Sequence, residues 1–231
     1  MAQPTTTNDP YQRRRAAGAA SREETRRRLV VAADSLFREE GYPATTVVAI
    51  AKRAEVSLQT LYLAWGSKRA LLRAAAAAAA VASETPMGSD EWRSIIRAEL
   101  TRDAGDDPTA GAYLAAASRL FVRVADRTAI YWRMYLQAAA SDPEIASDWA
   151  EIERDRRRTM EDVATNIPAH GLRPDLTLDD VADTLWALAS PDLYLLFRTE
   201  GGRDSLAFQT WLERTLIGAL CVTQGALILP P

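Results

Sequence analysis

The sequence predicts an all-α protein, with a small N-terminal domain of three helices followed by a larger helical domain. Apolar residues recur at intervals of three and four in successive segments, the spacing that gives a helix one buried face. Helix-starting residues and proline or glycine breaks separate these segments. Between residues 45 and 65, two short helical segments are joined by a very tight turn. No segment is expected to form a strand.

The composition is that of an ordinary globular protein. The 231 residues can hold one or two domains with a substantial core, and 48% of them are hydrophobic. No apolar run approaches the roughly 20 residues of a membrane span, and the N-terminus lacks the apolar core of a signal peptide. The single cysteine, Cys221, excludes an internal disulfide framework. We therefore expect a cytoplasmic protein with no membrane partner.

The net charge of −3 conceals a basic front and an acidic remainder. Residues 1–73 carry 13 Lys+Arg and 7 Asp+Glu, a balance of +6, so the remaining residues carry 15 and 24, a balance of −9. This asymmetry suggests that the N-terminal end meets a polyanion. Chance clustering on solvated helix faces is the alternative, and it would be preferred if the paired helices described below were absent.

Residues 1–20 are polar and lack an apolar period, so we expect a flexible basic arm. Arg13–Arg15 lies within it, and Arg26–Arg28 follows in the first helix. Guanidinium groups suit phosphate, and such an arm could reach a minor groove. A solubilising tail explains the same residues equally well, and the sequence does not decide between them.

The first helix is expected to start at Ser21 and to end near Glu40. Ser21 and Glu24 have the spacing of a capping box, in which each side chain satisfies a backbone N–H of the other residue. Gly41 follows at the position where a left-handed residue ends a helix. The inner stripe of this helix consists of Leu29, Val30, Ala33, Leu36 and Phe37.

The paired segments predict a helix-turn-helix. Thr45 is placed to cap the first helix, Glu55–Val56 leaves almost no room for a loop, and Ser57 can cap the second. Leu61 and Trp65 then share the inward face of the second helix. Polar and flat side chains face outward, which is the arrangement of a helix that enters the major groove of DNA. These outward side chains are Leu58, Gln59, Thr60, Tyr62 and Leu63.

The pattern resembles the N-terminal domain of the TetR family of transcriptional regulators over roughly residues 22–75. The matching residues are Phe37-x-x-x-Gly41-Tyr42-x-Ala44-Thr45-Thr46-Val47-x-x-Ile50-Ala51-x-x-Ala54-x-Val56-Ser57-x-x-Thr60-Leu61-Tyr62, then Trp65-x-Ser67-Lys68-x-x-Leu71-Leu72. Three positions depart from the family pattern, which usually has glycine at Glu55, a basic or small residue at Leu58, and histidine or another polar residue at Ala64.

The predicted DNA contacts divide into two kinds. Gln59 and Thr60 have hydrogen-bonding groups for base edges, and Leu58 and Leu63 suit thymine methyl groups. Phosphate contacts fix orientation without reading sequence. We assign them to Thr46, Ser57, Tyr62 and Lys68, and we include Thr45 in the DNA-binding set. A packing motif in a plain helical protein is the alternative.

Ser67 is expected to cap a helix that carries Lys68 in its first turn, where N–H groups and an ammonium can clamp phosphate. The helix continues through Ala74–Ala80, a stiff and slim rod of strong helix formers. It would link the DNA-binding domain, residues 21–73, to a ligand-binding and dimerisation domain, residues 74–231.

The second domain is predicted to be helical throughout. Helices are expected from Asp90, from Asp107–Pro108, over Thr128–Ala140 and from Asp142–Pro143 to about Asn166. The last two, Leu178–Glu200 and Ser205–Gln224, have apolar residues on more than one face, and Pro191 should bend the first of them. We expect them to pair with the same helices of a second copy, and the family resemblance implies the same homodimer.

Aromatic residues are concentrated in the second domain, where the resemblance implies an inducer cavity between bundle helices. As a group they favour a flat or apolar ligand, although core packing explains any single one better. The predicted ligand-binding residues are Tyr113, Phe121, Trp132, Tyr135, Trp186 and Tyr194, with Trp149 and Phe197 nearby. Possible polar anchors are Arg123, Arg133, Gln137 and Asp192.

No catalytic constellation is recognisable. The only histidine, His170, lies in a loop rich in proline and glycine, and Cys221 lies in an apolar helix, so neither a His-based dyad nor a usual zinc site is expected. We predict no cofactor, no metal and no enzyme activity.

These inferences predict a dimeric, ligand-responsive regulator, a repressor released from palindromic double-stranded DNA by a small-molecule effector. An all-helical small-molecule-binding protein or enzyme whose N-terminal domain no longer reads DNA is the alternative.

Overall fold

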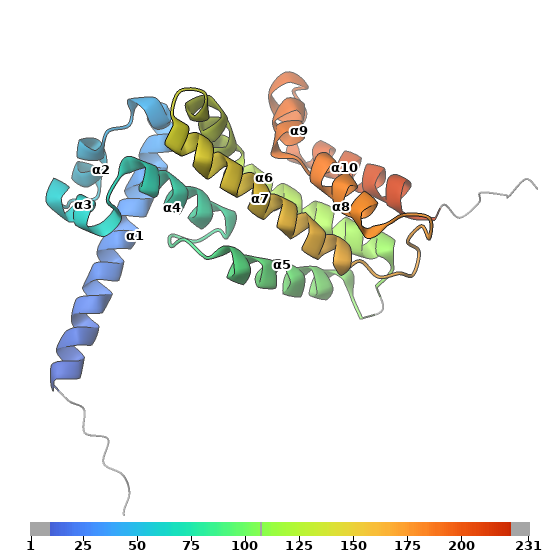
Figure 1. Ribbon diagram of the computed structural model, residues 1–231, viewed down its shortest axis with the longest axis horizontal. Coiled ribbons are helices and arrows are strands. Elements are labelled where there is room, and N and C mark those ends of the chain that lie inside the picture. Colours follow the sequence, from blue (N-terminus) through green and yellow to red (C-terminus); the bar gives the residue numbers. More distant parts are fainter. Residues whose placement is uncertain (1–9, 107, 223–231) are drawn as a thin grey trace, which may run out of the picture. The chain divides into compact units, whose positions relative to one another are not determined.

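The computed structural model describes residues 10–106 and 108–222, and within these residues the predicted all-α fold is confirmed (Figure 1). No strand occurs among them, and an isolated antiparallel bridge joins Leu172 to Cys221. No helix of the described chain is long and apolar enough to cross a lipid bilayer. The chain forms two compact units: the head, which ends at Ala78 and includes Ser83–Pro86, and the body, which comprises Ala79–Ala82 and the residues from Met87 onward.

The head contains α1 (Pro10–Ala44), α2 (Val47–Arg53), α3 (Leu58–Trp65) and most of α4 (Lys68–Ala80). The first three pack pairwise against one another. The predicted inner stripe of α1 is confirmed, because all five of its residues are buried. Each of the other helices adds large apolar side chains to the same core, namely Ile50, Leu61, Leu71 and Leu72.

The predicted start of the first helix is wrong. α1 begins at Pro10, so residues 10–20 are helical, and the Ser21 carbonyl accepts a bond from Thr25 Oγ1 at 2.9 Å inside the helix. Alanine, arginine and glutamine all favour helix, and this composition outweighs the capping signal at Ser21. Arg13–Arg15 is exposed on this extension. The remainder of the predicted arm, residues 1–9, lies outside the described residues.

Gly41 ends the regular part of α1, as predicted, with φ 79° and ψ 163°. The cap of α2 is one residue later than expected. Thr46 Oγ1 accepts a bond from the Ala49 N–H at 3.1 Å, and Thr46 itself has extended backbone angles. Thr45 turns inward instead.

The turn between α2 and α3 depends on one strained residue. Glu55 adopts φ 54°, and the Val56 N–H bonds back to the Ala51 carbonyl at 3.0 Å. This is the left-handed helix ending that glycine normally provides. A residue with a Cβ atom costs roughly 1–2 kcal/mol in this region. An exposed ion pair with Arg28, at 3.2 Å, offsets little of that cost.

Glu55→Gly should therefore stabilise the head by about 0.5–1 kcal/mol, since relief of strain exceeds the added freedom of the unfolded chain. Hydrogen exchange of the slowest head amides measures the change for this unit alone. Glu55→Ala is the control, because it removes the ion pair but keeps the Cβ atom. Equal stability of the two variants would contradict the assignment of strain to the backbone.

The body is built around α6 (Ala110–Ala139), which packs against α5 (Ser89–Ala104), α7 (Pro143–Thr165) and α10 (Ser205–Leu220). Figure 1 shows α6 and α7 running side by side, and α8 (Leu178–Leu188) covers α7.

Two predictions within the body are wrong. α6 is one continuous helix across Thr128, whose hydroxyl bonds back to the Val124 carbonyl at 2.9 Å instead of capping a new helix. The predicted helix over Leu178–Glu200 is broken into α8, α9 (Pro191–Leu195) and a π-helical turn over Leu196–Glu200. Pro191 starts α9 as its first residue, with Ser190 as the cap, so it interrupts the helix rather than bending it.

The last turn of α4 is tied into the body. The Arg127 guanidinium on α6 donates to the carbonyl oxygens of Ala79 and Ala80, at 2.9 and 2.8 Å. Ala82 follows with φ 53°, so a non-glycine residue ends this helix in the left-handed region as well. Burial lowers the pKa of Arg127. The carbonyl oxygens at the end of α4 thus accept bonds from the Arg127 side chain and from the backbone N–H groups of Ala82 and Ser83.

Candidate nucleic-acid interface

α3 presents one face to the core and the other to solvent. Leu61 is buried, while Tyr62 is 49% and Leu63 82% exposed. The inner face is further fixed by Trp65, whose Nε1 donates to the Arg26 carbonyl at 3.2 Å and whose ring lies 3.9 Å from the Arg26 guanidinium. Leu58 and Gln59 are exposed on the outer side, as predicted. A short helix held this firmly can offer its outer side chains at a fixed angle.

The start of α3 is capped as predicted. Ser57 Oγ accepts a bond from the Thr60 N–H at 3.0 Å, and the Ser57 and Thr60 hydroxyl oxygens lie 2.7 Å apart. Because the Thr60 hydroxyl already has a partner, Gln59 is the polar group of this face that is better placed to read a base edge.

Thr45 does not belong to the interface. Its side chain is 1% exposed, and its hydroxyl donates to the carbonyl oxygens of Gly41 and Leu36, at 2.8 and 3.2 Å. Its predicted contact with DNA is therefore wrong. Thr46 remains exposed beside it, at the start of α2.

Lys68 has a role inside the head that the sequence did not predict. Its ammonium donates to the carbonyl oxygens of Tyr42 and Thr45, at 2.8 and 2.9 Å, and lies 4.2 Å from the centre of the Tyr42 ring. Partial burial lowers the pKa of this lysine. The predicted phosphate clamp is thus occupied by protein groups, and Lys68 acts as a positioning residue for the loop before α2.

The basic charge of the head is also partly internal. Arg53 pairs with Glu39 at 2.9 Å, which ties α2 to α1, and Arg27 pairs with both Glu24 and Glu84. The Arg53 guanidinium holds the pKa of the Glu39 carboxyl far below its usual range. These arginines therefore also hold the head together, and the positive balance of the head is carried by its other basic residues.

Lys68→Met should lower the stability of the head by about 1–3 kcal/mol, because it keeps the side-chain stem but leaves two carbonyl oxygens without a donor. Hydrogen exchange of the α2 and α3 amides reports this loss. Lys52→Met, at an exposed position of α2, is the matched control and should have little effect. Unchanged stability with weakened DNA binding would instead support the phosphate contact.

The predicted aromatic ligand-binding residues fall into separate packing clusters. Trp132 and Tyr135 are buried on the same face of α6, and both pack against Trp149, with ring centres 4.2 and 6.1 Å away. Trp132 Nε1 also donates to Asp192 at 2.9 Å. Asp192, predicted as a ligand anchor, is thus engaged within the protein.

A second aromatic cluster joins α9 to α10. Tyr194 packs edge-on against Phe208, and its hydroxyl bonds to Asp126 and Ser205. Trp186, by contrast, is partly exposed, and Arg156 lies 4.9 Å from its ring centre.

The remaining predicted ligand residues are also accounted for by packing and surface contacts. Phe121 packs against the core of the body. Arg123 pairs with Glu99, and Arg133 and Gln137 are exposed. Core packing thus explains most of the aromatic set.

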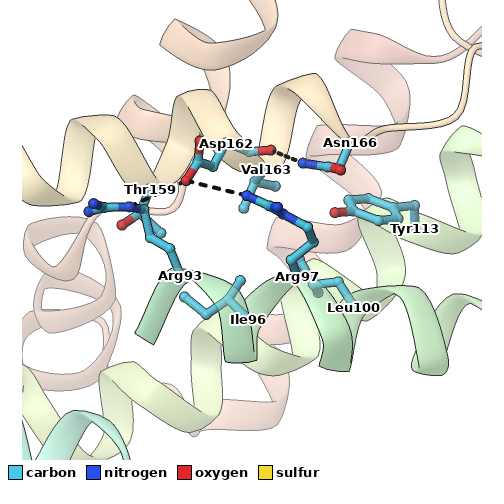
Figure 2. A pocket seen from close by; sticks show the side chains of 9 residues that line it. All are labelled: Arg93, Ile96, Arg97, Leu100, Tyr113, Thr159, Asp162, Val163 and Asn166. Carbon is cyan, nitrogen blue, oxygen red and sulfur yellow. Dashed lines mark hydrogen bonds and ion pairs between the residues drawn. The ribbon is translucent and has the colours of Figure 1, made fainter. Parts of the chain in front are cut away.

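One of the six residues, Tyr113, lines a pocket between α5, α6 and α7 (Figure 2). The sequence analysis missed its other polar members, above all Arg93 and Arg97. Their spacing in the sequence could have indicated this position, because Arg93 and Arg97 lie one turn apart on the same side of α5 as Ile96 and Leu100. A charged pair amid apolar positions at helical spacing is unusual for a solvated face.

Comparisons with known proteins agree with this architecture. Residues 29–75 match the family model described as bacterial regulatory proteins, tetR family. NalD, the secondary repressor of the MexAB-OprM multidrug efflux pump in Pseudomonas aeruginosa, superposes with a TM-score of 0.61 at 16% identity, covering 88% of this chain and 98% of NalD. No curated protein sequence matches the chain.

Two further similar structures were solved with bound molecules. The SmeT–triclosan complex has a TM-score of 0.60 at 19% identity and covers 90% of this chain and 98% of SmeT. FadR from Bacillus subtilis, in complex with stearoyl-CoA, has a TM-score of 0.57 at 19% identity and covers 82% of this chain and 96% of FadR. At such identities the likeness establishes a shared fold.

A capped, outward-facing second helix in a three-helix head is the geometry of a helix-turn-helix DNA-binding domain, and an all-helical body follows it in the chain. The predicted resemblance is confirmed: residues 29–75 match the tetR family model, and the chain shares its fold with solved structures described as tetR-family regulators.

Proposed function

We propose that the protein is a dimeric repressor that binds a palindromic DNA site through α3 and leaves it when a small molecule binds the body. The observation that carries this proposal is the outer face of α3, where Gln59, Tyr62 and Leu63 stand exposed on a helix anchored by Leu61 and Trp65. Two heads related by two-fold symmetry would require half-sites about 34–36 Å apart.

The dimer is proposed to form through α8 and α10 and the segment between them. Each of these two helices buries one side in its own body and leaves apolar side chains on the other, including Leu178, Trp186 and Leu206. Gly218 supports this surface. It lies exposed in the last turns of α10, and a Cβ atom there would meet no other atom within 4 Å. A glycine costs about 1 kcal/mol inside a helix, and close approach of a second helix would explain it.

Ligand binding would control the DNA affinity of this dimer. A small molecule in the body weakens DNA binding only if it binds better to a state whose heads do not fit the operator. The complexes of SmeT with triclosan and of FadR with stearoyl-CoA support a ligand-binding role for this kind of helical body.

Base reading and phosphate binding predict different mutant behaviour. Gln59→Ala should reduce discrimination between the operator and unrelated DNA by about 1–3 kcal/mol, whereas Tyr62→Ala should weaken binding to both DNAs alike. Fluorescence anisotropy with DNA from upstream of the gene, against a scrambled duplex, measures both effects. Gln137→Ala, an exposed glutamine in the body, is the matched control.

The salt dependence of the same binding curves tests the proposal as a whole. Affinity should fall steeply as salt rises, because each neutralised phosphate releases counterions. Affinity that does not change with ionic strength would contradict the interface and would favour a head that no longer reads DNA.

Gly218→Arg should convert the dimer to a monomer without unfolding the body, because the new side chain has open space within its own chain but would obstruct a second α10. Light scattering after gel filtration gives the mass of each form. Ala98→Arg introduces the same side chain at an exposed position of α5 and should leave the dimer intact. A variant at position 218 that stays dimeric would place the interface elsewhere.

A further inference from the structure

The pocket between α5, α6 and α7 has both apolar and charged walls. Ile96, Leu100 and Val163 form the apolar part, and Arg93, Arg97 and Asp162 the charged part. Its empty space, including the part open to solvent, is about 200 Å³, and its interior is narrow, with room for about one water-sized group. Such a hollow fits the polar end of a molecule rather than the whole of a large one.

Two buried polar atoms in this pocket have no hydrogen-bond partner. They are the Tyr113 hydroxyl, on a residue that is 2% exposed, and Nη1 of Arg93. A buried donor without a partner destabilises the fold, and such groups are rare unless a bound molecule satisfies them. Figure 2 shows the Tyr113 hydroxyl pointing into the hollow, on the side where Arg97 lies. Burial raises the pKa of Tyr113 to about 12, so the phenol stays a neutral donor at any physiological pH.

The charges in the pocket are unbalanced. Asp162 lies 3.3 Å from Arg93 Nε and 4.0 Å from Arg97 Nη2, so one carboxylate faces two guanidinium groups. Among the residues that line the pocket, two guanidinium groups therefore face one carboxylate. Asp90 also pairs with Arg93, but its side chain is almost fully exposed and its charge is well solvated. Arg97 is half-exposed, which leaves its donors accessible from the open side.

We propose that this pocket binds the carboxylate group of a small organic acid, with Arg97 and the Tyr113 hydroxyl as donors. A singly charged carboxylate can accept from both donors and meets less repulsion from Asp162 than a phosphate dianion would. The apolar wall suits a short hydrocarbon or aromatic remainder. This inference deepens the proposed function, because such an acid would be the effector of the regulator.

Direct binding to the full-length protein without DNA tests the site. Butyrate and benzoate are the probes, and butyramide and benzamide are their uncharged counterparts, with inorganic phosphate as a second anion. Calorimetry or amide chemical shifts should show saturable binding of the acids at millimolar concentrations or below. The amides should bind at least about tenfold more weakly, since hydrogen bonds to a charged group are stronger than those to a neutral one.

Two variants assign the donors. Tyr113→Phe removes only the unpaired hydroxyl and Arg97→Gln removes one charge, and each should weaken the acids about tenfold. Arg102→Gln, on the exposed side of the same helix, is the matched control and should bind the acids as the unaltered protein does. The thermal midpoint of Tyr113→Phe should not fall, which separates loss of a ligand donor from loss of structure.

Several outcomes would overturn the site: no saturable binding of either acid, equal affinity for acids and amides, tighter binding of phosphate, or unchanged affinity of Tyr113→Phe. Any of these, alongside intact salt-dependent DNA binding, removes the acid site and leaves the regulator. Saturable acid binding without DNA binding would support the acid site and contradict the proposed DNA-binding regulator.

Discussion

The ammonium of Lys68 is the contact on which the geometry of the head depends. It joins the first turn of α4 to the carbonyl oxygens of Tyr42 and Thr45, which precede α2 in the chain. α2 and α3 lie between these two points of the sequence, so one side chain closes the segment that carries both helices. Inside this closure, Thr46 and Ser57 cap the two helices, and Leu61 fixes the rotation of α3.

Closing this segment strains the backbone, and the strain lies in the turn between α2 and α3. The chain must reverse within two residues between α2 and α3, and Glu55 accepts a left-handed backbone to do so. The Arg28 guanidinium supports this turn from α1, by pairing with the Glu55 carboxylate and by donating to the Ala54 carbonyl. The contacts around the turn therefore hold Glu55 in its strained backbone conformation.

The head was largely predictable from the sequence because its signals are local. Caps, a tight turn and apolar residues at helical spacing involve neighbours in the chain, and they located α2, α3 and the end of α1. The errors concern partners distant in sequence. Neither the bond of Thr45 to Leu36 nor the ring contact of Trp132 with Trp149 has any sequence signal, because three-dimensional packing creates them. The same reason hid Arg93, whose significance depends on Asp162 and Tyr113 of other helices.

The far end of α4 has a mechanical consequence. Arg127 occupies the carbonyl oxygens of the last two residues of that helix, and the Ser83 N–H bonds back to the Ala78 carbonyl at 3.0 Å, so its final turn is closed on all sides. A helix end that is held in this way is protected from fraying. Ala79 and Ala80 are bound to one guanidinium of α6 within the body, so any displacement of Arg127 is passed first to these two residues.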